Sequence, residues 1–346
     1  MITPDAEALQ IARSVVVVDP PGSGPGMWAG GPSAVRSGGE IYLAYRLRRP
    51  VGQGRGYAVV LARSCDGERF ETIATIGKEQ LGAESLERPM LVRAPSGRWR
   101  LYLSCATPGT KHWRVEVLEA GDPGGFDPRE RQVVLPGDAA TAVKDPVIMY
   151  AGGCWHLWAS VHPIIDPDQA DQMVTCYATS ADGLDWGWHG TALRPRRGEW
   201  DARGVRVSAV RFTGDGVVAY YDGRASAAEN FEERTGVATG PGPAELTATG
   251  SVIGSPFGGG LRYVSIVGLG DGRERVYYEM ARADGAHELR TELRSAPAGL
   301  AGADELAATA ELAAAAELSR MAEPAAAAGL AGAAELAGAA EMAGPA

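Results

Sequence analysis

The chain has 346 residues, a formal net charge of −10 and an apolar fraction of 45%, which is ordinary for a globular protein. No apolar run approaches the ~20 residues that a membrane-spanning helix needs, so we expect no membrane segment. Seven acidic residues and one basic residue follow position 296, and the rest of the chain is therefore only mildly acidic. Without a basic stripe, the composition argues against a nucleic-acid partner.

The amino-terminal segment, residues 1–27, has no basic stretch ahead of an apolar one, so we predict no signal peptide and a cytoplasmic protein. Residues 15–18 predict a strand that joins the last sheet and closes a ring of sheets. The cysteines occur singly, without the paired spacing of a zinc site, so we expect buried reduced thiols and no metal. They are Cys65, Cys105, Cys154 and Cys176.

A pattern first seen in residues 144–188 recurs along the chain. Short β-rich runs alternate with Gly and Asp turns, which is typical of an antiparallel meander. Five copies occur at a period typical of propeller blades, roughly 40 to 50 residues. The copies span 28–76, 87–134, 144–193, 200–246 and 261–293. We therefore predict an all-β, five-bladed β-propeller over residues 28–295, with a long β-sandwich as the alternative.

Residues 296–346 differ in kind, because they repeat Ala, Glu, Leu, Gly and Met and contain no aromatic residue. Ala and Leu favour helix, but Gly and Pro interrupt it. We predict a flexible low-complexity tail with transient helix, and a docked amphipathic helix is the alternative.

The starts of the inner strands are predicted to converge on a central funnel, where a ligand would bind. Ionisable side chains stand at most of these starts, and their repetition sets them apart from isolated turn residues. The predicted funnel residues are Glu87, Arg88, Lys144, Asp145, Asp201, Arg203, Arg206, Arg262 and Tyr263. Loops after second strands add His162, Asp222 and Arg224 at the rim, where a solvated loop or a structural histidine is the plainer explanation.

Two of these starts carry a motif. Lys144-Asp145-Pro146 and, more loosely, Glu87-Arg88-Pro89 resemble the Asp-Pro and Arg-Asp-Pro segments of glycoside hydrolase families 32, 43, 68 and 130. The Ser-x-Asp-Gly turns at 64–70 and 180–186 also resemble turns of those five-bladed propellers. The resemblance covers residues 28–295 and implies catalytic acids at the starts of inner strands. It also implies an essential Asp on the first blade, where this chain has Gly31.

Glycoside hydrolysis needs one carboxyl group to protonate the leaving oxygen and a second to activate water or attack, about 6.5–9.5 Å apart for inversion and about 5–5.5 Å apart for retention. We assign Glu87 as the acid and Asp145 as the base, and the reverse assignment stays open. Asp201 would be a third carboxylate that raises the pKa of the acid by like-charge repulsion. Gly31 can fill neither role, so other blades supply the pair or the pair is broken.

The funnel cations suit a carboxylate or a phosphate, so the predicted ligand is an acidic sugar, a sugar phosphate, or phosphate as co-substrate. We predict a glycosidase, either a hydrolase or a phosphorylase, that acts on a small anionic glycoside. No Gly-rich phosphate loop stands between a strand and a helix, so no organic cofactor is expected. A non-catalytic sugar-binding propeller, which Gly31 supports, and a biosynthetic enzyme that reuses the funnel are the alternatives.

Overall fold

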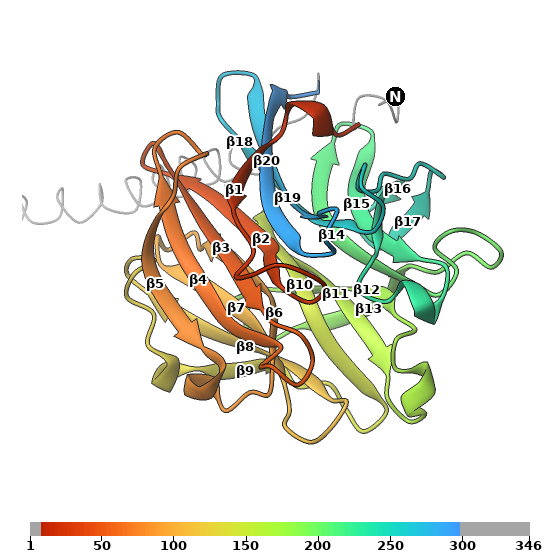
Figure 1. Cartoon of the computed structure of the whole chain (residues 1–346). Coiled ribbons are helices and arrows are strands. Elements are labelled where there is room, and N and C mark those ends of the chain that lie inside the picture. Colours follow the sequence, from red (N-terminus) through yellow and green to blue (C-terminus); the bar gives the residue numbers. More distant parts are fainter. Residues whose placement is uncertain (1–7, 298–346) are drawn as a thin grey trace, which may run out of the picture.

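In a computed structural model, which describes residues 8–297, twenty strands form five four-stranded antiparallel sheets, the blades, around a central axis (Figure 1). A parallel bridge joins the first and fifth of them into one eight-stranded sheet. The first sheet contains β2 (Trp28–Ser37), β3 (Glu40–Arg48), β4 (Gly56–Ser64) and β5 (Glu71–Gly77). The second contains β6 (Leu86–Arg93), β7 (Trp99–Ala106), β8 (Trp113–Ala120) and β9 (Gln132–Leu135). The third contains β10 (Thr141–Ala151), β11 (Cys154–Pro163), β12 (Val174–Ser180) and β13 (Gly187–Leu193). The fourth contains β14 (Gly204–Thr213), β15 (Gly216–Arg224), β16 (Arg234–Gly242) and β17 (Glu245–Ala248), and the fifth contains β18 (Leu261–Gly268), β19 (Arg273–Ala281), β20 (His287–Ser295) and β1 (Val15–Val18). The predicted all-β, five-bladed propeller is confirmed.

Helical structure in the described chain is limited to short 3-10 turns between strands. They are η2 (Ile11–Arg13), η3 (Lys78–Leu81), η4 (Pro128–Glu130), η5 (Pro167–Gln169) and η6 (Ala227–Glu229). None of the helices in residues 8–297 is long and apolar enough to cross a membrane. The predicted tail lies outside the described residues apart from positions 296 and 297, and the domain boundaries stay predictions.

The fifth sheet takes its outer strand from the other end of the chain. β1 pairs antiparallel with β20, with Val15 opposite Thr291 and Val18 opposite Leu289. A single parallel bridge between Trp28 and His287 also links β2 to β20, so the first and fifth sheets meet directly. Segments about 270 residues apart in sequence thus share one sheet, and the ring has no open gap between its first and last blades.

Five apolar clusters hold the sheets together, one in each interface between neighbouring blades. Leu61 and Leu103 represent the cluster between the first and second sheets, and Leu43 and Tyr277 the one between the first and fifth. The remaining three clusters fill the other interfaces in turn. Each sheet therefore buries both faces against neighbours, which a four-stranded sheet alone cannot do.

The two Ser-x-Asp-Gly turns lock one blade onto the preceding one. In both turns the Asp side chain accepts backbone N–H groups two and three residues later. The turn carbonyl of Gly67 accepts the Tyr277 hydroxyl at 2.9 Å, and that of Gly183 accepts the Tyr102 hydroxyl at 2.8 Å. The repeated motif thus serves contact between blades.

The four cysteines are unpaired, but the prediction that all are buried was wrong. Cys105 is buried, whereas Cys65 is exposed and the other two are intermediate. Cys65 lies between Ser64 and Asp66. The Ser64 hydroxyl donates to the Asp66 carboxylate and accepts the Gly67 N–H inside the turn, so the Cys65 side chain faces solvent. Within the described residues, no group of three His, Cys, Asp or Glu side chains could hold a metal ion.

Placing a charge on the inner side of β1 should weaken ring closure. Val17 packs against the cluster between the first and fifth sheets, whereas Val15 is 40% exposed. We expect Val17→Asp to lower the free energy of unfolding by about 1–2 kcal/mol, measured by chemical denaturation. The matched variant Val15→Asp should change it much less, and equal losses for both would contradict this role of β1.

Candidate functional site

Each inner strand carries a β-bulge or register shift near its start. Three bulge residues adopt a left-handed backbone, with φ of +61° at Gly31, +51° at Asp145 and +58° at Tyr263. Such a conformation costs a non-glycine residue about 1–3 kcal/mol. Hydrogen bonds to the preceding blade offset this cost. The backbone N–H of Asp145 donates to Ser104 Oγ at 2.9 Å, and that of Tyr263 donates to Asp222 Oδ1 at 3.0 Å. The bulges turn the side chains at these starts toward the axis.

The side chains that meet at the axis form what we call the central charged cluster. Its ten buried members are at most 4% exposed, and Lys144 lies at its edge with 14% of its side chain exposed. The carboxylates are Glu87, Asp145, Asp222, Glu233 and Glu279, and the cations are Arg46, Arg48, Lys144, Arg206, Arg224 and Arg262. Charges buried this deeply persist only when they are paired, so the pairing decides what each group can do.

Glu87, the predicted acid, is clamped by two arginines of β3. Arg46 Nη1 contacts Glu87 Oε2, and Arg48 Nη1 donates to Oε1 at 3.0 Å. Burial would raise the pKa of Glu87, but Arg46, Lys144 and Arg48 outweigh it and hold that pKa below its ordinary value. In this state Glu87 is an ionised partner rather than a proton donor.

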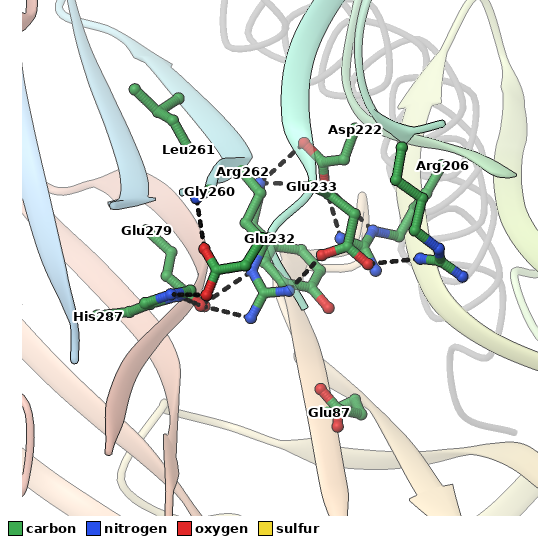
Figure 2. Close-up of polar contacts among 12 residues, drawn as sticks. Glu87, Arg206, Asp222, Glu232, Glu233, Gly260, Leu261, Arg262, Glu279 and His287 are labelled. Atoms are coloured by element: carbon green, nitrogen blue, oxygen red, sulfur yellow. Dashed lines mark hydrogen bonds and ion pairs between the residues drawn. The ribbon is translucent and has the colours of Figure 1, made fainter. Parts of the chain in front are cut away.

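A chain of ion pairs continues from Arg46 to the fifth and fourth sheets, and Figure 2 shows its part from Glu279 through Arg262 to Glu233. Glu279 Oε2 accepts from Arg46 at 3.0 Å, and its Oε1 accepts from Arg262 Nη2 at 2.7 Å. Arg262 also contacts Glu233, whose other oxygen accepts from Arg224 at 2.6 Å. Arg224 and Arg262, predicted to bind substrate, are thus engaged with carboxylates of the protein itself.

Asp145, the predicted base, lies between two cations. Its Oδ2 is 3.4 Å from Lys144 Nζ and 3.2 Å from Arg206 Nη1. Burial opposes ionisation, but these two charges lower the pKa of Asp145 to about 2. Asp145 is therefore a carboxylate at neutral pH and can accept a proton.

Asp222 and Tyr263 fill the space beneath these pairs. Asp222 Oδ2 accepts from Arg206 at 3.0 Å, while burial raises the pKa of Asp222 against that favourable charge. The Tyr263 ring lies 3.9 Å from the guanidinium of Arg206 and 5.2 Å from that of Arg262. An aromatic face between stacked arginines separates like charges and favours both. Both residues, predicted as ligand contacts, are fully buried.

Trp113, Lys144, Ser160 and His162 form what we call the mouth site, in which Trp113 and Lys144 are partly exposed and Ser160 and His162 are buried. Lys144 Nζ lies 4.9 Å from the half-buried Trp113 ring. The Nδ1 of His162 bonds the Ala170 carbonyl at 3.0 Å, while its Nε2 and the Ser160 hydroxyl have no partner among the described residues. Burial and Lys144 lower the pKa of His162 to about 3, so the imidazole is neutral and its Nε2 accepts. An aromatic ring, a cation and unpaired polar atoms thus lie beside Asp145.

The structure does not bring two predicted residues into the cluster. Asp201 accepts the Tyr221 hydroxyl at 2.8 Å and Arg196 Nε at 2.9 Å, and it therefore holds the start of the fourth blade. Arg203 Nε donates to Asp171 at 2.9 Å, between the loops of two blades. Asp201 and Arg203 make no hydrogen bond to Glu87 or Asp145. Both residues precede β14, which begins at Gly204, and therefore lie outside the bulge of that inner strand.

The ends of the second strands were only partly predicted, since His162, Asp222 and Arg224 were assigned to the loops that follow and lie instead within β11 and β15. Arg46, Ser160, Asp222 and Glu279 stand opposite the inner-strand starts in the strand register. A polar residue near the end of an apolar second strand, repeated in each copy, is the signal that could have found them. Only Asp222 was identified from it.

Glycine is required where the first blade meets Glu279. A Cβ at Gly30 would lie 1.9 Å from Glu279 Oε2, and one at Gly31 would lie 3.3 Å from Arg88 Cα. The place where the resemblance implies a catalytic Asp is therefore filled by a carboxylate from β19 and by the backbone of β6. Restoring Asp at position 31 would need Arg88 to move.

No protein-family model and no curated protein matches the chain. Among solved structures, β-1,2-mannobiose phosphorylase from Listeria innocua superposes with a TM-score of 0.58 at 15% identity, over 85% of this chain and 94% of that one. A thermostable family-43 glycoside hydrolase gives 0.59 at 13% identity, over 77% and 89%. The GH43_1 enzyme from Xanthomonas citri, complexed with xylotriose, gives 0.59 at 16% identity, over 83% and 93%.

This chain has the fold of the five-bladed glycoside hydrolases. The resemblance to families 43 and 130 is confirmed at that level, since a GH130 structure matches as well, with a TM-score of 0.56. At 13–16% identity, the likeness shows how the glycosidase-like propeller is built, and its chemistry must be argued from its own residues.

Removing one partner of the cluster should destabilise the propeller strongly. Glu279→Gln removes the carboxylate that Arg46 and Arg262 share and leaves each with a single carboxylate partner, and we expect a loss of about 3–5 kcal/mol in the free energy of unfolding. Asp271→Asn, which breaks the exposed pair with Arg273, is the control and should have little effect. Denaturant titration measures both, and a similar small loss for Glu279→Gln would contradict the role of the pairing.

The cluster also predicts acid sensitivity. A carboxyl group whose folded pKa is depressed stabilises the fold above its unfolded pKa and loses that contribution as pH falls through the folded value. For Asp145 the window runs from about pH 4 to about pH 2. We expect the Tm difference between wild type and Asp145→Asn to shrink across that window in a pH series. A constant difference would show that Asp145 is not ionised by the pairing.

Proposed function

We propose that this chain is a glycosidase that acts on a small anionic glycoside at the mouth site. The observation that carries the proposal is the state of Asp145, an ionised carboxylate between Lys144 and Arg206. It lies beside a partly exposed cation–aromatic pair and two unpaired polar atoms. Apolar and polar groups that converge in this way suit a sugar ring with its hydroxyls.

Each mouth residue has a role that follows from its chemistry. The Trp113 ring offers a flat apolar face to the sugar, and Lys144 attracts a carboxylate or phosphate on it. The neutral Nε2 of His162 accepts a sugar hydroxyl. Asp145, which is ionised at neutral pH, takes the proton of the attacking water, and its low pKa makes it a weak base that an anionic substrate beside Lys144 strengthens.

Glu87 must hold a proton to act as the acid, and an anionic substrate supplies the condition for this. A negative group at Lys144 competes for one of the cations that keep Glu87 ionised. It also adds a like charge next to Glu87, and both effects raise the pKa of that carboxyl. Glu87 then protonates the leaving oxygen as the glycosidic bond breaks. A neutral glycoside leaves Glu87 ionised, so the same geometry favours acidic sugars.

A non-catalytic sugar-binding propeller is the second candidate. The two-arginine clamp on Glu87 and the packing of Glu279 against Gly30 favour it, because both commit carboxylates to structure. In this case the mouth site binds the sugar and no bond is broken.

Turnover separates the two candidates. We would assay the full chain with 4-nitrophenyl glucuronide, galacturonide and the matching neutral glycosides, with and without inorganic phosphate, and follow Tm in parallel. The enzyme predicts cleavage of an acidic glycoside, with kcat lowered at least ~100-fold in Asp145→Asn and in Glu87→Gln and with KM nearly unchanged. Asp271→Asn should behave as wild type.

The other outcomes are equally specific. A rise in Tm with an acidic sugar but no cleavage supports the binding propeller. Cleavage only with phosphate present identifies a phosphorylase. Neither cleavage nor a rise in Tm with any acidic sugar would contradict both candidates.

A further inference from the structure

A second cavity opens along the same axis, at the end away from the charged cluster. Its volume is about 360 Å³, and later residues of all five inner strands line it. Apolar side chains make up much of its wall, among them Leu91, Ile148, Met149, Val210 and Ile266. The cluster, by contrast, gathers at the starts of those strands, so the two ends of the channel differ in chemistry.

Arg88 closes the inner end of this cavity. Its side chain is buried, with 1% of the residue exposed, and it lines the cavity. The Nη2 donates to the carbonyl oxygens of Pro32, Ser208 and Val264 at 3.4, 2.7 and 3.3 Å. The Nε and Nη1 have no hydrogen-bond partner among the described residues. Two donor groups of a buried guanidinium are therefore left for a ligand.

The charge of Arg88 is also poorly compensated. Its bonded neighbours are carbonyl oxygens, and burial lowers the pKa of Arg88 to about 10 despite the more distant charges of Asp222 and Asp145. A buried cation without a carboxylate partner is costly, and an incoming anion would remove that cost.

Ser208 adds a second unused polar group to the same wall. Its Oγ is buried without a partner among the described residues, although its carbonyl oxygen accepts from Arg88. Ser265, which also lines the cavity, is already engaged, since its Oγ accepts the Ala34 N–H at 3.0 Å. The unmet donors therefore gather at one end of an apolar cavity.

We propose that this cavity binds a small aliphatic carboxylate. Its headgroup would accept from a free N–H of Arg88 and from the Ser208 hydroxyl, and its alkyl chain would lie against the apolar wall. Arg36 and Arg93 also line the cavity, near the ends of β2 and β6, whereas the unbonded N–H groups of Arg88 lie beside Ser208. An inorganic anion bound there would leave the apolar wall unused. The site is separate from the mouth site, and its occupation requires no glycoside.

Calorimetric titration of the full chain with sodium octanoate tests this directly, with octan-1-ol and inorganic phosphate as comparison ligands. We expect octanoate to bind at least ~10-fold more tightly than octan-1-ol, the ratio expected for a hydrogen bond to a charged group, and phosphate not to compete. Ser208→Ala should weaken octanoate binding about ten-fold for the same reason. Arg88→Gln should abolish the preference for the carboxylate over the alcohol.

Because Arg88 also bonds three backbone carbonyls, its variant could fail to fold, and Val210→Phe provides an independent test. Val210 lines the cavity two residues beyond Ser208 on β14, so a phenyl group there should take up space that the ligand needs, and we expect it to abolish octanoate binding. The matched control Val51→Phe alters a residue that is 70% exposed in the β3–β4 loop and should bind as wild type. Equal octanoate affinity in Val210→Phe and wild type, equal affinity for octanoate and octan-1-ol, or no octanoate binding would each overturn the proposal.

Discussion

The need to pair buried charges governs the centre of this propeller. Glu87 reaches from the second blade to Arg46 of the first, and Arg46 reaches on to Glu279 of the fifth. Arg262 of the fifth blade meets Glu233 of the fourth, and Arg206 of the fourth meets Asp145 of the third. The backbone N–H of Arg88, in the second blade, donates to Asp145 Oδ1 at 3.3 Å and completes the circuit.

This polar circuit follows the five apolar clusters around the same axis. The apolar clusters supply most of the free energy of packing. The charged circuit adds little net stability, but it penalises any arrangement in which one partner is missing. The same pairing keeps these carboxylates ionised, because the arginines favour the charged form. In the proposed mechanism, stability and turnover would therefore depend on the same side chains.

Much of the fold could be predicted from the sequence, because turn signals and β-rich runs are local and repeat in each blade. The inner-strand starts at Glu87 and Asp145 were found for the same reason. Arg48 and Glu279 were missed, since their importance comes from register across strands rather than from a local motif. Asp201 was misplaced because β14 begins at Gly204, and a shift of a few residues moves a side chain out of the bulge. The ionisation states, which depend on distances between blades, lay beyond sequence reasoning altogether.

The pairing of β1 with β20 has a consequence for how the protein is made. A ribosome releases Val15–Val18 long before it synthesises Leu289, the partner of Val18. During that interval the strand has no partner in its own sheet, and its backbone N–H and C=O groups remain exposed to other chains. The first blade can pack on the second meanwhile, but the nascent ring stays open until the fifth blade emerges. Translation pauses in the last blade should therefore lengthen the period in which the growing chain is most prone to aggregation.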